Sequence, residues 1–199
     1  MARRSTASEE EIGTMISSAA ANRTLGQVQE HELALRARRL GIPLASHDDD
    51  GVGMVQDSLS RGVAICEFPT DLASARAAQD GGALVLMGAP NWVRGGSHIR
   101  AMGVKEALAA GVLDALCSDY HYPSLFHAPF LLESRAGVPL ADAWAMISER
   151  PARAAGLGHR LGRIAPGYEA DLLLVEPVAN GLPRLRQVFV GGREVARFT

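Results

Sequence analysis

The chain has 199 residues, 47% of them hydrophobic and 21% charged, which is enough apolar material for a sizeable core and typical of a globular protein. Its formal net charge of −2 at pH 7 argues against a nucleic acid or a membrane surface as the main partner. The chain has two cysteines, Cys66 and Cys117, and no Cys-x-x-Cys motif that would suggest a zinc site. Both are therefore expected to be free, buried thiols in a reducing compartment. No apolar run approaches the ~18 residues of a membrane span, and no hydrophobic signal core is present, so the sequence predicts a cytoplasmic protein.

The first forty residues carry the pattern of two helices. A helix begins at Glu9 with Ser8 as its N-cap. The polar residues Asn22–Thr24 interrupt the pattern, and a second helix runs over Gln27–Leu40 and stops at Gly41.

Four strand–helix units follow. The predicted strands are Ile42–Ala45, Val63–Phe68, Leu84–Met87 and Leu113–Cys117. The predicted helices that follow them are Val52–Leu59, Leu72–Gln79, Val104–Ala110 and Leu125–Glu133. Short apolar strands that alternate with helices form parallel βα units. Such folds keep their active sites at the carboxyl ends of the strands.

Polar side chains gather at those strand ends. They are His47, Glu67, Asn91 and Asp119. Imidazole and carboxylate groups are ligands for a divalent metal such as zinc, manganese or iron. Two plainer interpretations stay open, because a single histidine is often structural and the acidic run Asp48–Asp50 also suits a solvated helix cap. The recurrence of these residues at successive strand ends favours one shared site.

The third strand is followed by the polar stretch Asn91–His98, NWVRGGSH. Arg94 offers paired donors for phosphate or carboxylate oxygens, and adjacent glycines let backbone N–H groups approach a ligand. The sequence therefore predicts an anion-binding loop formed by Asn91, Arg94, Gly95, Gly96, Ser97 and His98. The alternative is a solvated surface loop in which Arg94 makes a surface salt bridge.

The remainder of the chain changes character. A helix is predicted over Leu140–Ser148, and a strand over Asp171–Val175. The segments Gln187–Val190 and Glu194–Phe198 form a hairpin around Gly191 and Gly192. We therefore assign residues 1–160 to an α/β body and residues 161–199 to part of a small β appendage.

These motifs resemble the amidohydrolase superfamily, in which a (β/α)₈ barrel carries a metal site at its strand ends. In that superfamily a histidine ends strand five, another ends strand six, and an aspartate ends strand eight. His47 matches the strand-five histidine and Asp119 the strand-eight aspartate. Gly162–Leu172, GRIAPGYEADL, matches the G-x-I-x-x-G-x-x-A-D-L segment of the small β domain.

The resemblance implies the C-terminal half of a TIM-type barrel with part of a small β domain. A full (β/α)₈ barrel takes about 250 residues, and this chain offers four βα units. Glu67 stands where strand six usually ends in histidine, so either Glu67 or His98 would be the second ligand. The H-x-H motif of strand one and the bridging lysine or carboxylate are absent, which leads us to expect an incomplete copy.

Within the superfamily, ASHDD, EFPT, MGAPN-x-x-RGGSH and SDY resemble the diphosphatases of phosphonate catabolism. Those enzymes hydrolyse the 5-triphosphate of alpha-D-ribose 1-methylphosphonate to the 5-phosphate and pyrophosphate. The resemblance implies His47, Glu67 and Asp119 as metal ligands, with Asp119 also taking the proton of the attacking water. It implies a phosphorylated small-molecule substrate held by Arg94 and its loop, with Lys105 as a possible addition.

Two alternatives remain: a C–N hydrolase such as a deaminase or cyclic amidase, and an inactive half-barrel. We expect the chain alone to be inactive, and to form a homo-oligomer or pair with a missing N-terminal half.

Overall fold

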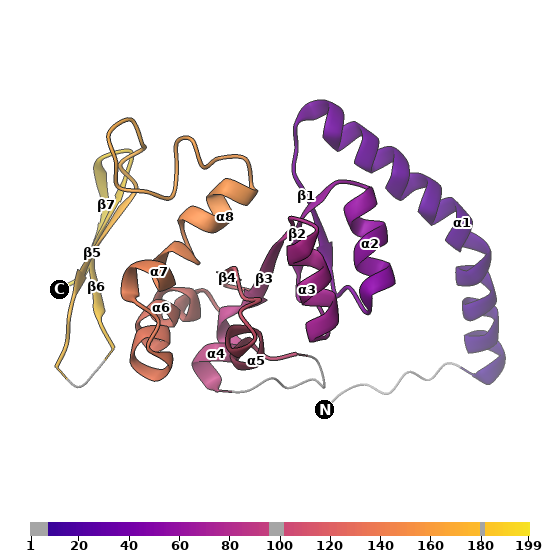
Figure 1. The fold of residues 1–199 in the computed structure, drawn as a ribbon, viewed down its shortest axis with the longest axis horizontal. Coiled ribbons are helices and arrows are strands. Elements are labelled where there is room, and N and C mark those ends of the chain that lie inside the picture. The colour runs from indigo at the N-terminus through magenta and orange to yellow at the C-terminus, as the bar shows by residue number, and fades with distance from the viewer. Residues whose placement is uncertain (1–7, 96–101, 180–181) are drawn as a thin grey trace. The chain divides into compact units, whose positions relative to one another are not determined.

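The computed structural model describes residues 8–95, 102–179 and 182–199 (Figure 1). The chain divides into two compact units, Met1–Gly41 and Ile42–Thr199. The division predicted at residue 160 separates a body from an appendage within the second unit and stays a prediction. Among the described residues, no helix is both long and apolar enough to cross a membrane.

The described part of the first unit is one helix of 32 residues, α1 (Glu9–Leu40). The Ser8 hydroxyl accepts from the backbone N–H of Glu11, whose carboxylate accepts from the backbone N–H of Ser8 at 2.7 Å. The helix ends at Gly41, which adopts the left-handed conformation with φ 65°. The predicted start and stop are confirmed. The interruption predicted at Asn22–Thr24 is wrong, because such residues weaken a helix only slightly and no proline enforces a break.

The centre of the second unit is a four-stranded parallel sheet, in the order β1-β2-β3-β4. Its strands are β1 (Leu44–His47), β2 (Val63–Glu67), β3 (Leu84–Gly88) and β4 (Ala115–Cys117). Each strand neighbours the next one in the chain, as successive right-handed βα units require. The predicted α/β class with four βα units is confirmed.

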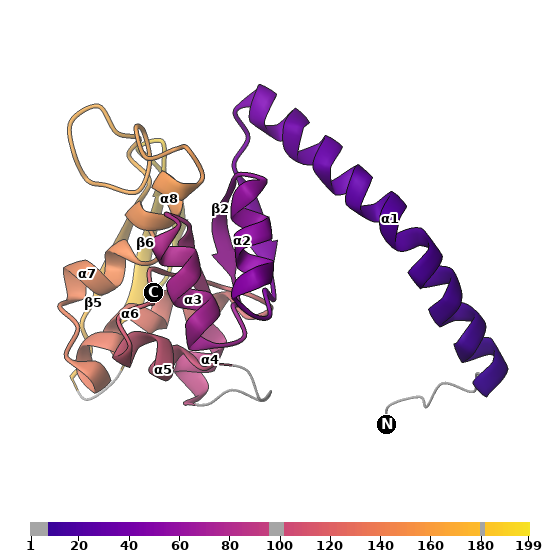
Figure 2. The same cartoon turned by 45° about the vertical axis from the view of Figure 1, so that its right-hand side comes forward.

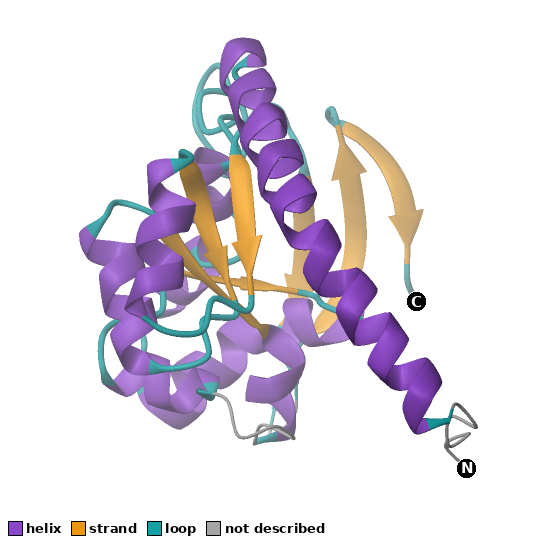
Figure 3. Ribbon diagram, turned by 90° about the vertical axis from the view of Figure 1, so that its right-hand side faces the viewer, coloured by secondary structure: helices purple, strands orange, loops and turns teal. Residues whose placement is uncertain are grey.

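Helices cover one face of this sheet (Figure 3). They include α2 (Val52–Ser60), α3 (Leu72–Asp80) and α5 (Val104–Ala109). Val85 and Met87 of β3 are buried in the core under them, whereas Leu84 and Leu86 are half-buried and point to the opposite face. We call the covered face, which carries Val85 and Met87, the helix face, and the opposite one, which carries Leu86, the site face.

A short helix follows β3 where the sequence predicts a loop. This helix, α4 (Ala89–Arg94), has Pro90 in its first turn, where a missing backbone N–H costs nothing. The loop predicted to begin at Asn91 is therefore wrong in its first residues, because the proline that ends the strand is also well placed to start a helix. The later residues of that predicted loop, 96–98, lie outside the described part of the chain.

Three further helices complete the body (Figure 2). They are α6 (Tyr122–Ala136), α7 (Leu140–Ala145) and α8 (Glu149–Ala154). α4 and α6 pack against each other. Arg135 of α6 donates to the carbonyl oxygens of Trp92 and Val93 at 3.4 and 3.3 Å, which satisfies the last carbonyls of α4.

The C-terminal residues form a separate antiparallel sheet of β5 (Leu172–Glu176), β6 (Arg184–Val190) and β7 (Arg193–Arg197). Gly191 and Gly192 join β6 to β7 with φ values of 56° and 77°. Two central residues with positive φ match the twist of a hairpin, and glycine takes that conformation without strain. The predicted appendage hairpin is confirmed.

Candidate functional site

The polar residues predicted from the strand ends lie at the same edge of the parallel sheet. His47 and Glu67 are the last residues of β1 and β2 and are register partners. Gly88 ends β3 opposite Cys117, which ends β4. Asp119 follows two residues later. Parallel register therefore brings four successive strand ends together, and their chemical roles depend on what lies between them.

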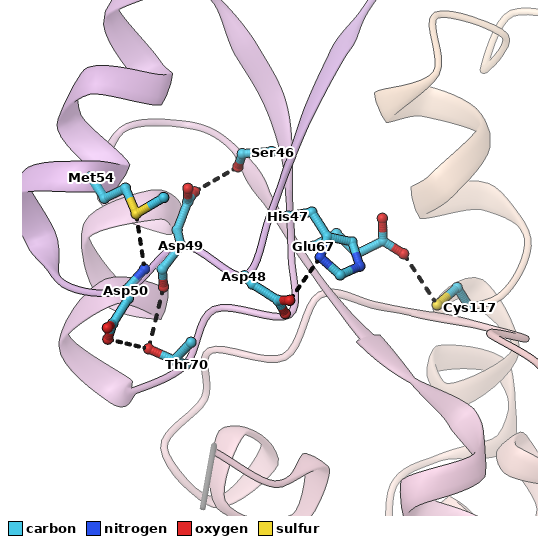
Figure 4. A network of polar contacts seen from close by, with 9 residues as sticks. All are labelled: Ser46, His47, Asp48, Asp49, Asp50, Met54, Glu67, Thr70 and Cys117. Carbon is cyan, nitrogen blue, oxygen red and sulfur yellow. Dashed lines mark hydrogen bonds and ion pairs between the residues drawn. The ribbon is translucent and has the colours of Figure 1, made fainter. Parts of the chain in front are cut away.

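His47, Glu67 and Cys117 share the site face of the sheet (Figure 4). The Cys117 thiol donates to Oε1 of Glu67 at 3.7 Å, so these two side chains meet across β3. Gly88, at the end of β3, has Asp119 and Phe68 as neighbours, since a Cβ built on it would lie 3.5 Å from Oδ2 of Asp119 and 3.5 Å from the Phe68 ring, which is ordinary van der Waals contact. A carboxylate and an aromatic ring thus lie beside the end of β3, next to the pair of Glu67 and Cys117.

Burial of the Cys117 thiol is the main reason that its pKa is raised, to about 11. The carboxylates of Glu67 and Asp119 add to the rise, because a thiolate beside them is repelled. At neutral pH Cys117 is therefore a protonated hydrogen-bond donor, and nucleophilic catalysis through this thiol is disfavoured. The sequence analysis identifies Cys117 only as a free thiol and misses its place in the site.

In the described part of the chain, three non-glycine residues adopt the left-handed conformation, and each comes just after a strand end. They are Asp48, Phe68 and Asp119, with φ values of 57°, 54° and 47°. Phe68 is the unusual one, because a bulky side chain resists this conformation while aspartate tolerates it. Strained residues of this kind gather at functional sites, where the surrounding structure holds them in place. Phe68 belongs to the EFPT motif, but the sequence alone assigns it no role in the site.

Two neighbours orient the imidazole of His47. Its Nδ1 lies 3.1 Å from Oδ2 of Asp48, and its ring meets the Phe68 ring edge-to-face with centroids 5.1 Å apart. The side chains of His47 and Asp48 are 58% and 64% exposed, so a ligand can reach them. A carboxylate at one imidazole nitrogen is a common way to hold the ring for metal or substrate binding at the other.

The donor types at this edge suit a divalent metal, but their arrangement falls short of a complete site. Within residues 8–95, 102–179 and 182–199, no three histidine, cysteine, aspartate or glutamate side chains converge closely enough to hold an ion. His98, the other candidate ligand, lies outside this part of the chain. The ligand roles of His47, Glu67 and Asp119 stay predictions.

On the helix face, the same edge holds a buried carboxylate. Asp49 is 2% exposed and accepts from Ser46 Oγ at 2.6 Å, Ser58 Oγ at 3.2 Å and Cys66 Sγ at 3.4 Å. Burial, with a contribution from Asp49, raises the pKa of Cys66 to about 12. The N-cap of α2 is Gly51, so the interpretation of Asp49 as a solvated helix cap is wrong. Its carboxylate ties β1, β2 and α2 together instead.

The part of the predicted anion-binding loop that the structure describes lies in α4 and its cap. Asn91 is half-buried and Arg94 is exposed. Gly95 has φ 84°, and its N–H donates to the carbonyls of Asn91 and Trp92, so this N–H caps the helix and does not face a ligand. Arg94 donates to the hydroxyl of Tyr120, a residue that the sequence analysis does not single out. Gly96, Ser97 and His98 lie outside the described residues.

A cavity of about 1210 Å³ lies between helices α6, α7 and α8 and strand β5. Its lining includes the aromatic side chains of Phe126, Phe130 and Trp144. Ser118, one residue before Asp119, contributes to the lining. Among the predicted site residues that the structure describes, which are His47, Glu67, Asn91, Arg94, Gly95 and Asp119, none is among the lining residues.

Comparison with known proteins places these features in a family. The model of the Amidohydrolase family matches residues 13–195. Over 156 residues the chain is 40% identical to the alpha-D-ribose 1-methylphosphonate 5-triphosphate diphosphatase of Escherichia coli (strain K12). This match covers 77% of the chain and 41% of the relative, so the chain spans less than half of that protein's length.

Solved structures show the same fold at low identity. An adenosine deaminase from Xanthomonas campestris with bound zinc is 18% identical with a TM-score of 0.59, over 84% of this chain and 48% of that one. An enamidase of the amidohydrolase superfamily is 14% identical with a TM-score of 0.60, over 83% of this chain and 50% of that one. The parallel sheet with its helices is the shared α/β fold, and the half-barrel interpretation is compatible with it. Because the family model matches residues 13–195, which is most of this chain, the chain belongs to the amidohydrolase family.

Proposed function

We propose that this chain provides part of the active site of a metal-dependent phosphoanhydride hydrolase. Its substrate is the 5-triphosphate of alpha-D-ribose 1-methylphosphonate, and its products are the 5-phosphate and pyrophosphate. The observation that carries the proposal is the 40% identity over 156 residues to a diphosphatase of that name. The carboxylates at the strand ends and the exposed cation of Arg94 are the groups that such a reaction needs.

In this proposal His47, Glu67 and Asp119 are the chain's contribution to a divalent metal site of zinc, manganese or iron. A bound divalent ion supplies charge neutralisation at the phosphoryl oxygens and makes water more acidic. Asp48 and Phe68 hold the His47 ring in place. Asp119, held in the left-handed conformation over Gly88, takes the proton of the attacking water.

Arg94 binds the polyphosphate part of the substrate, together with Asn91, Gly96, Ser97 and His98. A guanidinium is a strong partner for phosphate oxygens because its N–H groups form paired, charge-assisted hydrogen bonds. The capping role of the Gly95 N–H removes that group from the proposed contacts.

The proposal includes a second polypeptide, either a further copy of this chain or a chain that supplies the other strands of the barrel. Among the described residues of the second unit, β1 pairs with β2 alone and so has an unpaired outer edge. The outer strand on the other side, β4, is partly covered, since its Leu116 N–H donates to the carbonyl of Met146 at 3.0 Å. An unpaired parallel edge favours the addition of another strand.

The test measures pyrophosphate release from the ribose triphosphate by ³¹P NMR, with zinc, manganese or iron(II) added in turn. We expect negligible turnover by the chain alone, because its described residues assemble no three-ligand site. Co-expression with the part of the E. coli diphosphatase that this chain does not match is expected to restore metal-dependent turnover. The complete E. coli enzyme is the positive control, and sedimentation of the same samples reports on assembly.

Robust hydrolysis by the chain alone would contradict the proposed assembly. Deamination of adenosine by the complemented protein, without pyrophosphate release, would support the C–N hydrolase alternative. No turnover of either substrate, while the E. coli enzyme is active, would support the inactive-fragment alternative.

A further inference from the structure

Tyr120 follows Asp119 directly, and none of the roles proposed above uses it. Its side chain is 63% exposed. Arg94 donates to its hydroxyl, and the guanidinium carbon of Arg94 lies 5.4 Å from the centre of its ring. The two residues come from the segments that follow β3 and β4, so their contact joins two strand ends of the site.

The turn that carries Tyr120 contacts both the start and the end of α4. The turn is closed by the His121 N–H, which donates to the carbonyl of Ser118 at 3.0 Å. At the start of α4, Asp119 Oδ2 lies next to Gly88; at the end of α4, Tyr120 holds Arg94. A six-residue helix is about 9 Å long, so one tight turn sets the spacing between the carboxylate and the cation.

The backbone at the end of α4 is already fixed, because Arg135 donates to the carbonyls of Trp92 and Val93. The backbone does not fix the side chain of Arg94, which is long and exposed and, without a partner such as Tyr120, would have many rotamers to lose when it binds a ligand. The guanidinium has five N–H donors, and the hydroxyl of Tyr120 occupies only a small part of that capacity. The remaining donors can still contact an anion.

We propose that Tyr120 is a positioning residue. It holds the guanidinium of Arg94 at the Asp119 turn, so that the guanidinium is already ordered before phosphate oxygens bind to it. The inference rests on the proposed function, since it assigns to Arg94 the diphosphate part of the substrate. The opposite arrangement, in which Tyr120 sequesters Arg94 from the ligand, gives binding changes of the opposite sign.

Calorimetric titration of the 199-residue chain with inorganic pyrophosphate at low ionic strength tests this proposal. Arg94→Ala is expected to remove most of the affinity and most of its salt dependence. Tyr120→Leu is expected to weaken binding about tenfold and Tyr120→Phe, which keeps the ring, about threefold. Because Tyr120 acts through Arg94, adding Tyr120→Leu to Arg94→Ala is expected to cause no further loss.

Tyr122→Leu is the matched control, since Tyr122 is 79% exposed and lies two residues further along the same segment. Its affinity is expected to equal that of the wild type. Arg193→Ala, at an exposed arginine of β7, controls for the loss of one positive charge. Unchanged unfolding temperatures in all variants exclude a loss of fold.

Any one of the following results would overturn the positioning role. Unchanged or tighter binding by Tyr120→Leu, with weak binding by Arg94→Ala, contradicts the inference and leaves the anion-binding role of Arg94 intact. Unchanged binding by Arg94→Ala, or no binding by the wild type, contradicts both. NMR gives a ligand-free readout: ring-current shifts of the Arg94 side-chain protons are expected in the wild type and in Tyr120→Phe, and not in Tyr120→Leu. Their absence from the wild type also contradicts the inference.

Discussion

Two neighbouring aspartates of the acidic run Asp48–Asp50 lie in opposite environments on the two faces of the parallel sheet. Asp49 turns to the helix face, where it is 2% exposed and accepts hydrogen bonds from Ser46, Ser58 and Cys66. Asp48, its neighbour, is 64% exposed and pairs with His47 of the site face. A saturated buried carboxylate holds the structure together, whereas an accessible carboxylate with one partner keeps its capacity to bind.

The same contrast separates the carboxylates of Glu67 and Asp119, near the ends of β2 and β4, from the carboxylate of Asp71, which caps a helix. Asp71 is the N-cap of α3 and accepts from the backbone N–H of Ser74 at 2.8 Å. Glu67 accepts from a weak thiol donor at 3.7 Å, and Asp119 is held in a strained backbone conformation. The sheet thus separates groups that stabilise the fold from groups that remain available for chemistry.

The largest effect is expected from Asp119→Asn in the protein complemented as described for the proposed function. Turnover should fall about 10³-fold, since asparagine cannot take the proton, while the fold should persist because asparagine tolerates the left-handed conformation. Asp48→Asn is the comparison, since Asp48 has the same left-handed backbone conformation but follows β1 instead of β4. Its loss should be clearly smaller, because Asp48 only orients the His47 ring. Equal losses in both variants would mean that Asp119 has no special role on the site face.

A smaller but still large effect is expected from Asp49→Ala, measured by urea unfolding of the chain. The buried donors Ser58 and Cys66 and the half-buried Ser46 lose their acceptor, which should lower the free energy of unfolding by about 3 kcal/mol. Asp48→Asn, on the exposed side of the same run, keeps a residue that tolerates the left-handed conformation at φ 57° and should change it by less than about 0.5 kcal/mol. If the two variants are equally stable, the division between the faces is wrong.

The smallest effect is expected from Asp71→Ala, which removes the N-cap of α3 and should cost about 1 kcal/mol at pH 7. The backbone N–H of Ser74 is the main cause that holds the pKa of Asp71 below its ordinary value of 3.8. The stabilisation is therefore fully present above that value and is lost as the pH falls through the lower pKa of the folded state.

Urea unfolding of the wild type and Asp71→Ala at pH 7 and at pH 3 checks this dependence. The difference between the two proteins should shrink at the lower pH. Asp80→Ala, at the other end of α3, should show neither the loss nor the pH dependence. A difference that stays constant with pH would contradict the capping role.

Local patterns in the sequence account for much of the fold. Alternating apolar strands and helices predict the four βα units, and Ser8 and Gly41 predict the limits of α1. The same periodicity places His47 and Glu67 at neighbouring strand ends. These features follow from the sequence because hydrophobic period, capping and turn chemistry act over a few residues.

Contacts between distant residues account for what the sequence leaves open. Which aspartate of the run becomes buried depends on Ser58 and Cys66, which reach Asp49 only after β1, β2 and α2 have packed. The contact of Glu67 with Cys117 joins β2 and β4 across β3, and the contact of Arg94 with Tyr120 joins the segments that follow β3 and β4. The hydrophobic periodicity of the sequence predicts which face of the sheet a residue occupies. Which other side chain it contacts there depends on the parallel register of the strands and on helix packing.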